Sequence, residues 1–96
     1  MNERRVVITG FGTVSPLGND LNTTWEGLKA GKSGIDYITQ LDTTDYPVKI
    51  GGEAKDFDPK PYFNDAKDAR RADRYTQLAM AASKMAVEDS GLDPEA

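Results

Sequence analysis

Four basic side chains recur at helical spacing in the second half of the chain: Lys67, Arg70, Arg71 and Arg74. On a single helix they stand at i, i+3, i+4 and i+7 and share one cationic face, with Asp73 off that face. Such a face could bind an anionic partner, either a phosphate group or an acidic protein. By spacing alone, the favoured interpretation is a solvated surface with internal ion pairs, each worth about 0–1 kcal/mol.

A pair of glycines follows the first apolar run, in the order Gly10-Phe11-Gly12. The spacing nearly matches the Gly-x-Gly-x-x-Gly fingerprint of dinucleotide-binding folds. Ser15 replaces the third glycine, and Pro16 follows where a helix should run. No acidic residue closes a second strand about 20 residues further on. We therefore interpret the pair as a tight turn that leaves a buried strand.

The sequence Gly31-Lys32-Ser33 imitates the end of a phosphate-binding loop. The true motif needs a glycine at the position of Glu26, and it follows a strand and opens a helix. Here the tripeptide follows a predicted helix, so Gly31 is better explained as the stop of that helix. We expect no nucleotide at this site.

The chain contains no cysteine and no histidine. Ser-His and Cys-His catalysis are therefore excluded within it, as are zinc sites built from these residues. Asp56, Asp58 and Asp65 lack the spacing of a calcium loop, and we interpret them as solvated loop carboxylates. The sequence predicts no catalytic residue, no metal site and no cofactor in this segment.

Two strands are predicted among the elements that position these residues. Residues 4–9 contain three consecutive β-branched side chains, which favour a strand buried on both faces. Residues 32–46 are predicted to be irregular. Residues 48–54 alternate between apolar and polar, which indicates a strand with one polar face, weakened by two glycines.

The first predicted helix begins with a Thr-x-x-Glu capping box at Thr23 and Glu26. It ends at Gly31, a residue type that commonly stops helices. Its apolar residues Trp25 and Leu28 are expected to face inward. The helix is therefore predicted to pack through this side.

A basic helical stretch is predicted from Asp65, and the longest helix spans residues 73–90 and stops at Gly91. Apolar residues cover most of the circumference of this long helix. A helix of that kind belongs inside a larger structure. Its narrow polar stripe consists of Arg74, Gln77, Lys84 and Glu88.

The composition of the chain argues against several classes of function. The 96 residues allow one domain at most, and the net charge of −4 argues against nucleic-acid binding. The start of the chain is not expected to act as a signal peptide, and no run approaches the roughly 20 apolar residues of a membrane span. The absence of cysteine fits a reducing compartment, so a cytoplasmic protein is expected. Two unpaired strands amount to half an α/β sheet, which indicates a shortened sequence.

Several stretches, taken in order, resemble the amino-terminus of one enzyme family, the β-ketoacyl-acyl-carrier-protein synthases, and within it the synthase II group. Each stretch alone is weak, but the ordered set is specific and spans nearly the whole chain. The stretches are residues 4–12 (RRVVITGFG), 15–19 (SPLGN), 24–25 (TW), 31–35 (GKSGI), 55–58 (KDFD), 70–77 (RRADRYTQ) and 88–92 (EDSGL).

The resemblance implies an α/β fold, with residues 1–96 as the amino-terminal part of a thiolase-like five-layer αβαβα fold. The family works as a homodimer without a cofactor. It condenses malonyl-carrier protein with an acyl-enzyme thioester and releases CO2, as one step of fatty acid biosynthesis. Its cysteine nucleophile and two histidines match no residue here, so the chain alone is expected to be inactive.

The resemblance also changes the interpretation of the basic residues. In the family, a basic helix of this segment helps to receive the acidic acyl carrier protein, and the matching positions are Lys67, Arg70 and Arg71. Arg74 has weaker support. The alternative hypothesis is a small stand-alone module that binds an acidic protein through the Lys67–Arg74 face.

Overall fold

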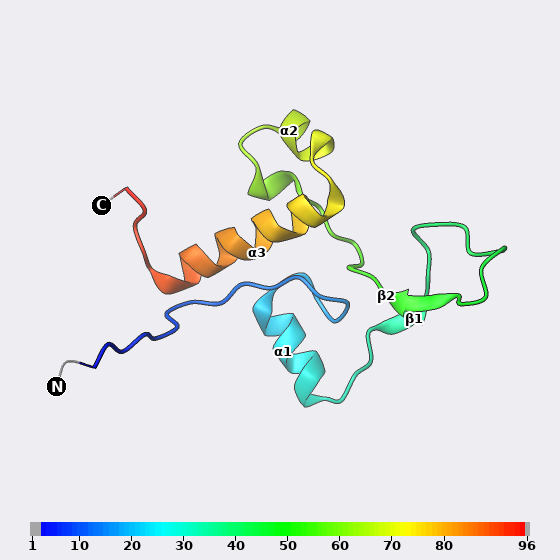
Figure 1. Cartoon of the computed structure of the whole chain (residues 1–96), viewed down its shortest axis with the longest axis horizontal. Helices are drawn as coiled ribbons and strands as arrows, with labels where there is room; N and C mark the ends of the chain where they lie inside the picture. The colour runs from blue at the N-terminus through cyan, green and yellow to red at the C-terminus, as the bar shows by residue number, and fades with distance from the viewer. Residues whose placement is uncertain (1–2, 96) are drawn as a thin grey trace.

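Residues 3–95 are described by a computed structural model (Figure 1). Met1, Asn2 and Ala96, which the predicted segment 1–96 includes, lie outside the described residues. The elements are α1 (Leu21–Lys29), β1 (Ile35–Tyr37), β2 (Ile50–Gly52), the 3-10 helix η1 (Lys60–Tyr62), α2 (Ala66–Arg71) and α3 (Arg74–Ser90).

The predicted strand at residues 4–9 is wrong for this structure. The segment is extended but pairs with no strand among residues 3–95. Val6 is 95% exposed and Val7, which points to the opposite face, is 64% exposed, so neither face of the segment is covered. Its β-branched residues favour extended backbone, but a strand also needs a neighbouring backbone to bond to, and the described residues supply none.

The two glycines that follow lie directly against α3, where the start of the chain runs beside this helix (Figure 1). A Cβ added at Gly12 would meet the carbonyl oxygen of Ala82 and stand 2.7 Å from the nitrogen of Ala86. One at Gly10 would stand 2.6 Å from the nitrogen of Ser90. The interpretation as a tight turn is therefore wrong: the glycines let two backbones approach closely.

Helix α1 begins one turn earlier than predicted. Asp20 is its N-cap, and the Asp20 carboxylate accepts a hydrogen bond of 2.7 Å from the backbone nitrogen of Thr23. This bond lowers the pKa of Asp20. Thr23 therefore stands inside the first turn, at the position that donates to the cap, and the predicted capping box is wrong.

The end of α1 agrees with the prediction. Gly31 has a φ of 68°, in the left-handed region that glycine tolerates. The nitrogen of Lys32 bonds to the carbonyl of Gly27, and that of Gly31 bonds to the carbonyl of Leu28. These two bonds form a Schellman motif.

The prediction that Trp25 and Leu28 face inward is wrong. Their exposed fractions are 56% and 57%. The buried residue of α1 is Gly27, over which the side chain of Leu17 lies. The helix packs through its smallest residue, and its two large apolar residues stay uncovered within residues 3–95.

Strands β1 and β2 form an antiparallel ribbon in which Ile35 pairs with Gly52 and Tyr37 with Ile50. The prediction for residues 48–54 is confirmed only for the three residues of β2, and β1 lies in the stretch predicted to be irregular. The predicted half of an α/β sheet is therefore an isolated ribbon here. It sits on Pro16, whose Cγ would be 2.9 Å from a Cβ added at Gly52.

Polar side chains shape the loop that joins the two strands. The ammonium group of Lys49 donates to the carbonyl oxygens of Thr43 at 2.6 Å, Thr44 at 3.2 Å and Tyr46 at 2.9 Å. These bonds satisfy all three donors of the ammonium group. We call residues 38–49 the hairpin loop.

The carboxylate of Glu53 closes the base of the hairpin loop. It accepts hydrogen bonds from the backbone nitrogens of Thr39 at 2.9 Å and Gln40 at 3.0 Å. The bond from Thr39 is the main reason why the pKa of Glu53 is lowered. Nearer the tip, the hydroxyl of Thr44 donates to Asp42 at 2.6 Å and lowers the pKa of Asp42.

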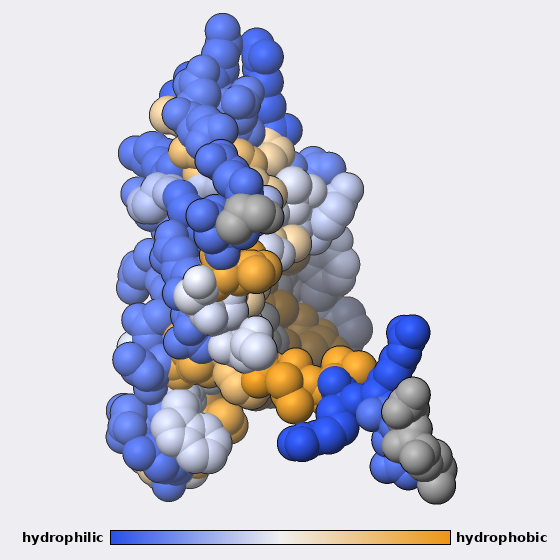
Figure 2. Space-filling model, turned by 90° about the vertical axis from the view of Figure 1, so that its left-hand side faces the viewer, coloured by the Kyte–Doolittle hydropathy of each residue, from blue (hydrophilic) through white to orange (hydrophobic). Residues whose placement is uncertain are grey.

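The predicted helices from Asp65 and over residues 73–90 are confirmed as α2 and α3, and Gly91 stops α3 with a φ of 72°. Ala69 and Ala81 are the only fully buried apolar side chains among residues 3–95. Large apolar side chains instead reach the surface, and Figure 2 shows several apolar areas on the face that it draws. Surface of this kind is typical of a segment that packs against further protein.

Candidate functional site

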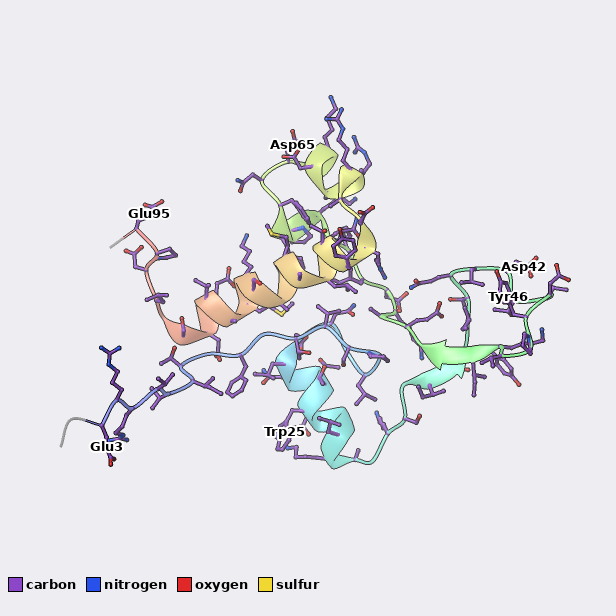
Figure 3. All side chains as sticks on the ribbon, viewed as in Figure 1. Glu3, Trp25, Asp42, Tyr46, Asp65 and Glu95 are labelled. Atoms are coloured by element: carbon purple, nitrogen blue, oxygen red, sulfur yellow. The ribbon has the colours of Figure 1, made fainter. Side chains whose placement is uncertain are left out.

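The three basic residues predicted to bind a partner lie together on α2. Lys67, Arg70 and Arg71 are exposed, whereas Ala69 between them is buried. Figure 3 shows nitrogen-tipped side chains that extend from α2 away from the rest of the molecule. We call these three residues the basic surface.

Ion pairs do not neutralise the basic surface within the part of the chain that the structure describes. The two ion pairs found there join Lys29 to Glu26 and Lys55 to Asp36. Asp68 is the one acidic residue within α2 itself. Because the chain as a whole carries a net charge of −4, the basic surface is a local positive region on an acidic protein.

Arg74 does not belong to this surface, so the predicted four-residue face is wrong. Helix α2 ends at Arg71, and Ala72 and Asp73 are extended, with ψ angles of 141° and 156°. Arg74 opens α3 instead. Its guanidinium group donates to the carbonyl of Ala54 at 3.0 Å and lies 5.2 Å from the ring centre of Phe57.

Two further polar residues of α3 hold neighbouring segments. The side-chain amide nitrogen of Gln77 donates to the carbonyls of Ala69 at 2.7 Å and Ala72 at 3.3 Å. The ammonium group of Lys84 donates to the carbonyl of Pro61 at 3.2 Å. The sequence places both residues in a polar stripe and indicates no role for either. Their position on an otherwise apolar helix was the available signal, because polar groups in such places usually have partners.

The Gly31-Lys32-Ser33 sequence is confirmed as a helix end. Helix α1 precedes it and β1 follows it, which is the reverse of the order in a phosphate-binding loop. The hydroxyl of Ser33 accepts a bond of 3.2 Å from the nitrogen of Ile35 and so helps to form the turn into β1.

Two of the three loop carboxylates have local structural roles. Asp58 accepts a bond of 3.0 Å from the nitrogen of Lys60, at the start of η1. Asp65 is the N-cap of α2 and accepts a bond of 2.9 Å from the nitrogen of Lys67. No group of three potential metal ligands occurs in the described residues.

An open hollow of about 550 Å³ lies between the strand ribbon and the start of α3, and Glu53, Lys55 and Arg74 line part of it. Glu53 and Arg74 are already bonded to backbone groups. The charges around the hollow have both signs, so it shows no preference for a cation or an anion.

Comparison with known proteins places this geometry in a family. The family model described as the N-terminal domain of β-ketoacyl synthases matches residues 3–96. The chain belongs to the β-ketoacyl synthase family. The hypothesis of a small stand-alone module is therefore not favoured.

Curated members of the family resemble this β-ketoacyl synthase segment closely. The 3-oxoacyl-[acyl-carrier-protein] synthase 2 of Staphylococcus aureus (strain COL) is 51% identical over 90 residues, which cover 94% of this chain and 22% of the relative. The protein of the same name from Coxiella burnetii (strain RSA 493 / Nine Mile phase I) is 48% identical over 93 residues, or 97% of this chain and 22% of the relative. The chain thus spans about a fifth of the length of these relatives.

A solved structure, "The ishigamide ketosynthase/chain length factor", shares the fold with a TM-score of 0.85 at 38% identity. The match covers 98% of this chain and 23% of that one. The helices and the small sheet therefore form part of a ketosynthase fold of the α/β class. Within residues 3–95, no helix has both the length and the apolar character needed to cross a membrane.

Proposed function

We propose that this chain is the amino-terminal segment of a 3-oxoacyl-acyl-carrier-protein synthase. The complete enzyme condenses malonyl-carrier protein with an acyl-enzyme thioester and releases CO2. The observation that carries the proposal is 51% identity, over 94% of the chain, to a relative of that name. In the proposed whole, a cytoplasmic homodimer, this segment forms part of a five-layer αβαβα arrangement.

The exposed apolar residues support this proposal. Val6, Ile8 and Tyr75 are large side chains with exposed fractions of 95%, 74% and 73%. Burial of one such side chain stabilises a fold by roughly 1.5–3 kcal/mol, so an enzyme gains by covering them. Further polypeptide of the synthase is the proposed cover.

The chain by itself should not catalyse the condensation. Its 96 residues contain neither cysteine nor histidine, so the proposed mechanism has no nucleophile or imidazole base here. The test is release of CO2 from malonyl-carrier protein by the purified chain and by the complete synthase. We expect turnover by the complete synthase and none by the purified chain. Turnover by the purified chain would contradict the proposal.

We also propose that the basic surface receives the acyl carrier protein. The support is the exposure of Lys67, Arg70 and Arg71 on one short helix, together with the carrier protein in the names of the relatives. Complementary charge of this kind raises the association rate and fixes the orientation of the partner. Salt weakens it, because the Debye length is about 10 Å at 0.1 M salt.

Charge reversal tests the docking proposal. In the complete synthase, the double variant Arg70→Glu/Arg71→Glu should bind carrier protein at least about tenfold more weakly at low salt, and the difference should shrink as salt is added. Lys29→Glu/Lys32→Glu is the matched control, because it changes the net charge equally at the end of α1. Equal affinities of the Arg70/Arg71 variant and the wild type at low salt would refute the proposal.

A further inference from the structure

The basic surface stands on a helix too short to hold its own orientation. Helix α2 contains six residues, and isolated helices shorter than about 12–15 residues are marginal in water. Asp65 caps its beginning. The direction in which the basic side chains project therefore depends on what fixes the other end of the helix.

Gln77 of α3 fixes that other end. Its side-chain amide nitrogen donates to the carbonyls of Ala69 and Ala72, at 2.7 and 3.3 Å. The last four carbonyls of a helix have no partner within the helix, and these two belong to that group. One amide carries two hydrogens, so both are used. The two carbonyls immediately precede and follow the pair Arg70 and Arg71.

We propose that Gln77 is a positioning residue for carrier-protein docking. By holding the backbone on either side of Arg70 and Arg71, it sets the direction of both guanidinium groups before the partner arrives. A surface ordered in advance loses less conformational entropy on binding. The inference rests on the proposed docking function. Its effect falls on binding of the carrier-linked substrate and not on the reacting atoms.

Another residue of α3 provides a matched control. Lys84 also donates to a backbone carbonyl, that of Pro61, at 3.2 Å. Pro61 lies in η1 and not in α2. Loss of the Lys84 bond therefore removes a comparable hydrogen bond between α3 and η1, while the bonds at the end of α2 remain.

Steady-state kinetics of the complete synthase test the inference. Gln77→Met keeps the length of the side chain and removes the donor. It should raise KM for carrier-linked substrate about three- to tenfold, with less than a twofold change in kcat. The rise should vanish near 1 M salt, where charge-based docking is screened. KM for the same acyl group on a small thiol should show no such rise. Lys84→Met should leave both KM values unchanged.

The outcomes separate this inference from the docking proposal. If Arg70→Glu/Arg71→Glu weakens docking but Gln77→Met leaves KM unchanged, only the positioning role fails. If the charge reversal has no effect, both fail. A salt-independent fall in kcat with both substrates would mean a general structural role and would overturn the inference. Gln77→Leu, which also removes the donor and adds no charge, supplies the same comparison if Gln77→Met does not fold.

Discussion

The junction of the first segment with α3 and the hairpin loop are built in opposite ways. At the junction, Gly10 and Gly12 bring one backbone against another with no room for a methyl group. Backbone groups of the hairpin loop are bound by two long side chains, that of Lys49 within the loop and that of Glu53 at its base. Neither region has a large buried side chain. One substitution at the junction should therefore lower the free energy of unfolding strongly. One substitution in the loop should mainly increase local hydrogen exchange.

The largest expected effect is at the junction. Gly12→Ala places a methyl group against the carbonyl of Ala82 and the backbone of α3. Overpacking usually lowers the free energy of unfolding by about 1–3 kcal/mol, and because the obstacle is backbone we expect the upper end of this range. Thermal unfolding of the complete synthase measures the effect.

Gly31→Ala is the control for this substitution. Nothing lies within 4 Å of a Cβ added at Gly31, but the φ there is 68°. The variant therefore meets backbone strain without a clash, and it should cost about 1–2 kcal/mol. A smaller loss for Gly12→Ala than for Gly31→Ala would show that the junction is not closely packed in the whole protein.

A medium effect is expected in the hairpin loop. Lys49→Met removes the ammonium group that binds the carbonyls of Thr43, Thr44 and Tyr46. Because the loop is exposed, the global free energy of unfolding should change by less than about 1 kcal/mol. Locally, hydrogen exchange of the bonded amides of Thr44 and Tyr46 should become about tenfold faster, which corresponds to a loss of roughly 1.4 kcal/mol. Unchanged exchange would show that Lys49 does not hold the loop.

The smallest effect concerns pH. Hydrogen bonds hold the pKa of Glu53 below its usual 4.5 in the folded protein. A carboxyl group whose pKa is lowered by folding stabilises the fold above the unfolded value, and this contribution is lost as the pH falls through the folded value. Protection of Thr39 and Gln40 should therefore be constant from pH 7 to 5 and decline below 4.5.

The control for the pH effect is Glu53→Gln, compared with wild type at each pH so that intrinsic exchange rates cancel. The variant should exchange faster than wild type at pH 7, and the difference should disappear in acid. A difference that persists well below pH 4.5 would contradict the assignment to the carboxylate.

Local signals allowed the correct predictions. Helix α3 and its stop at Gly91 follow from apolar periodicity and a terminal glycine, and α2 follows from the helical spacing of Lys67, Arg70 and Arg71. The beginning of α1 was misplaced because Asp20 and Thr23 are both good caps three residues apart. The sequence does not show which of the two oxygens finds a donor.

Features that depend on residues far apart in the chain could not be predicted from the sequence. The β-branched run at residues 4–9 favours a strand, but no propensity provides the partner that a strand needs. Arg74 has the correct helical spacing, but the extended backbone of Ala72 and Asp73 separates it from α2. Gln77 remained unassigned because its partners, including Ala69, are known only once α2 lies beside α3.

The hydrogen bond from the nitrogen of Phe11 to the carboxylate of Asp89 has a consequence for biosynthesis. It joins residues 78 positions apart in the chain. Contacts of such high sequence separation form late, since the entropy of closing the intervening loop must be overcome first. At about 5–20 residues per second, a ribosome needs roughly 4–16 s to add that stretch. For this interval residues 10–12 have no α3 to lie against, and this is the period when a chaperone would protect them best.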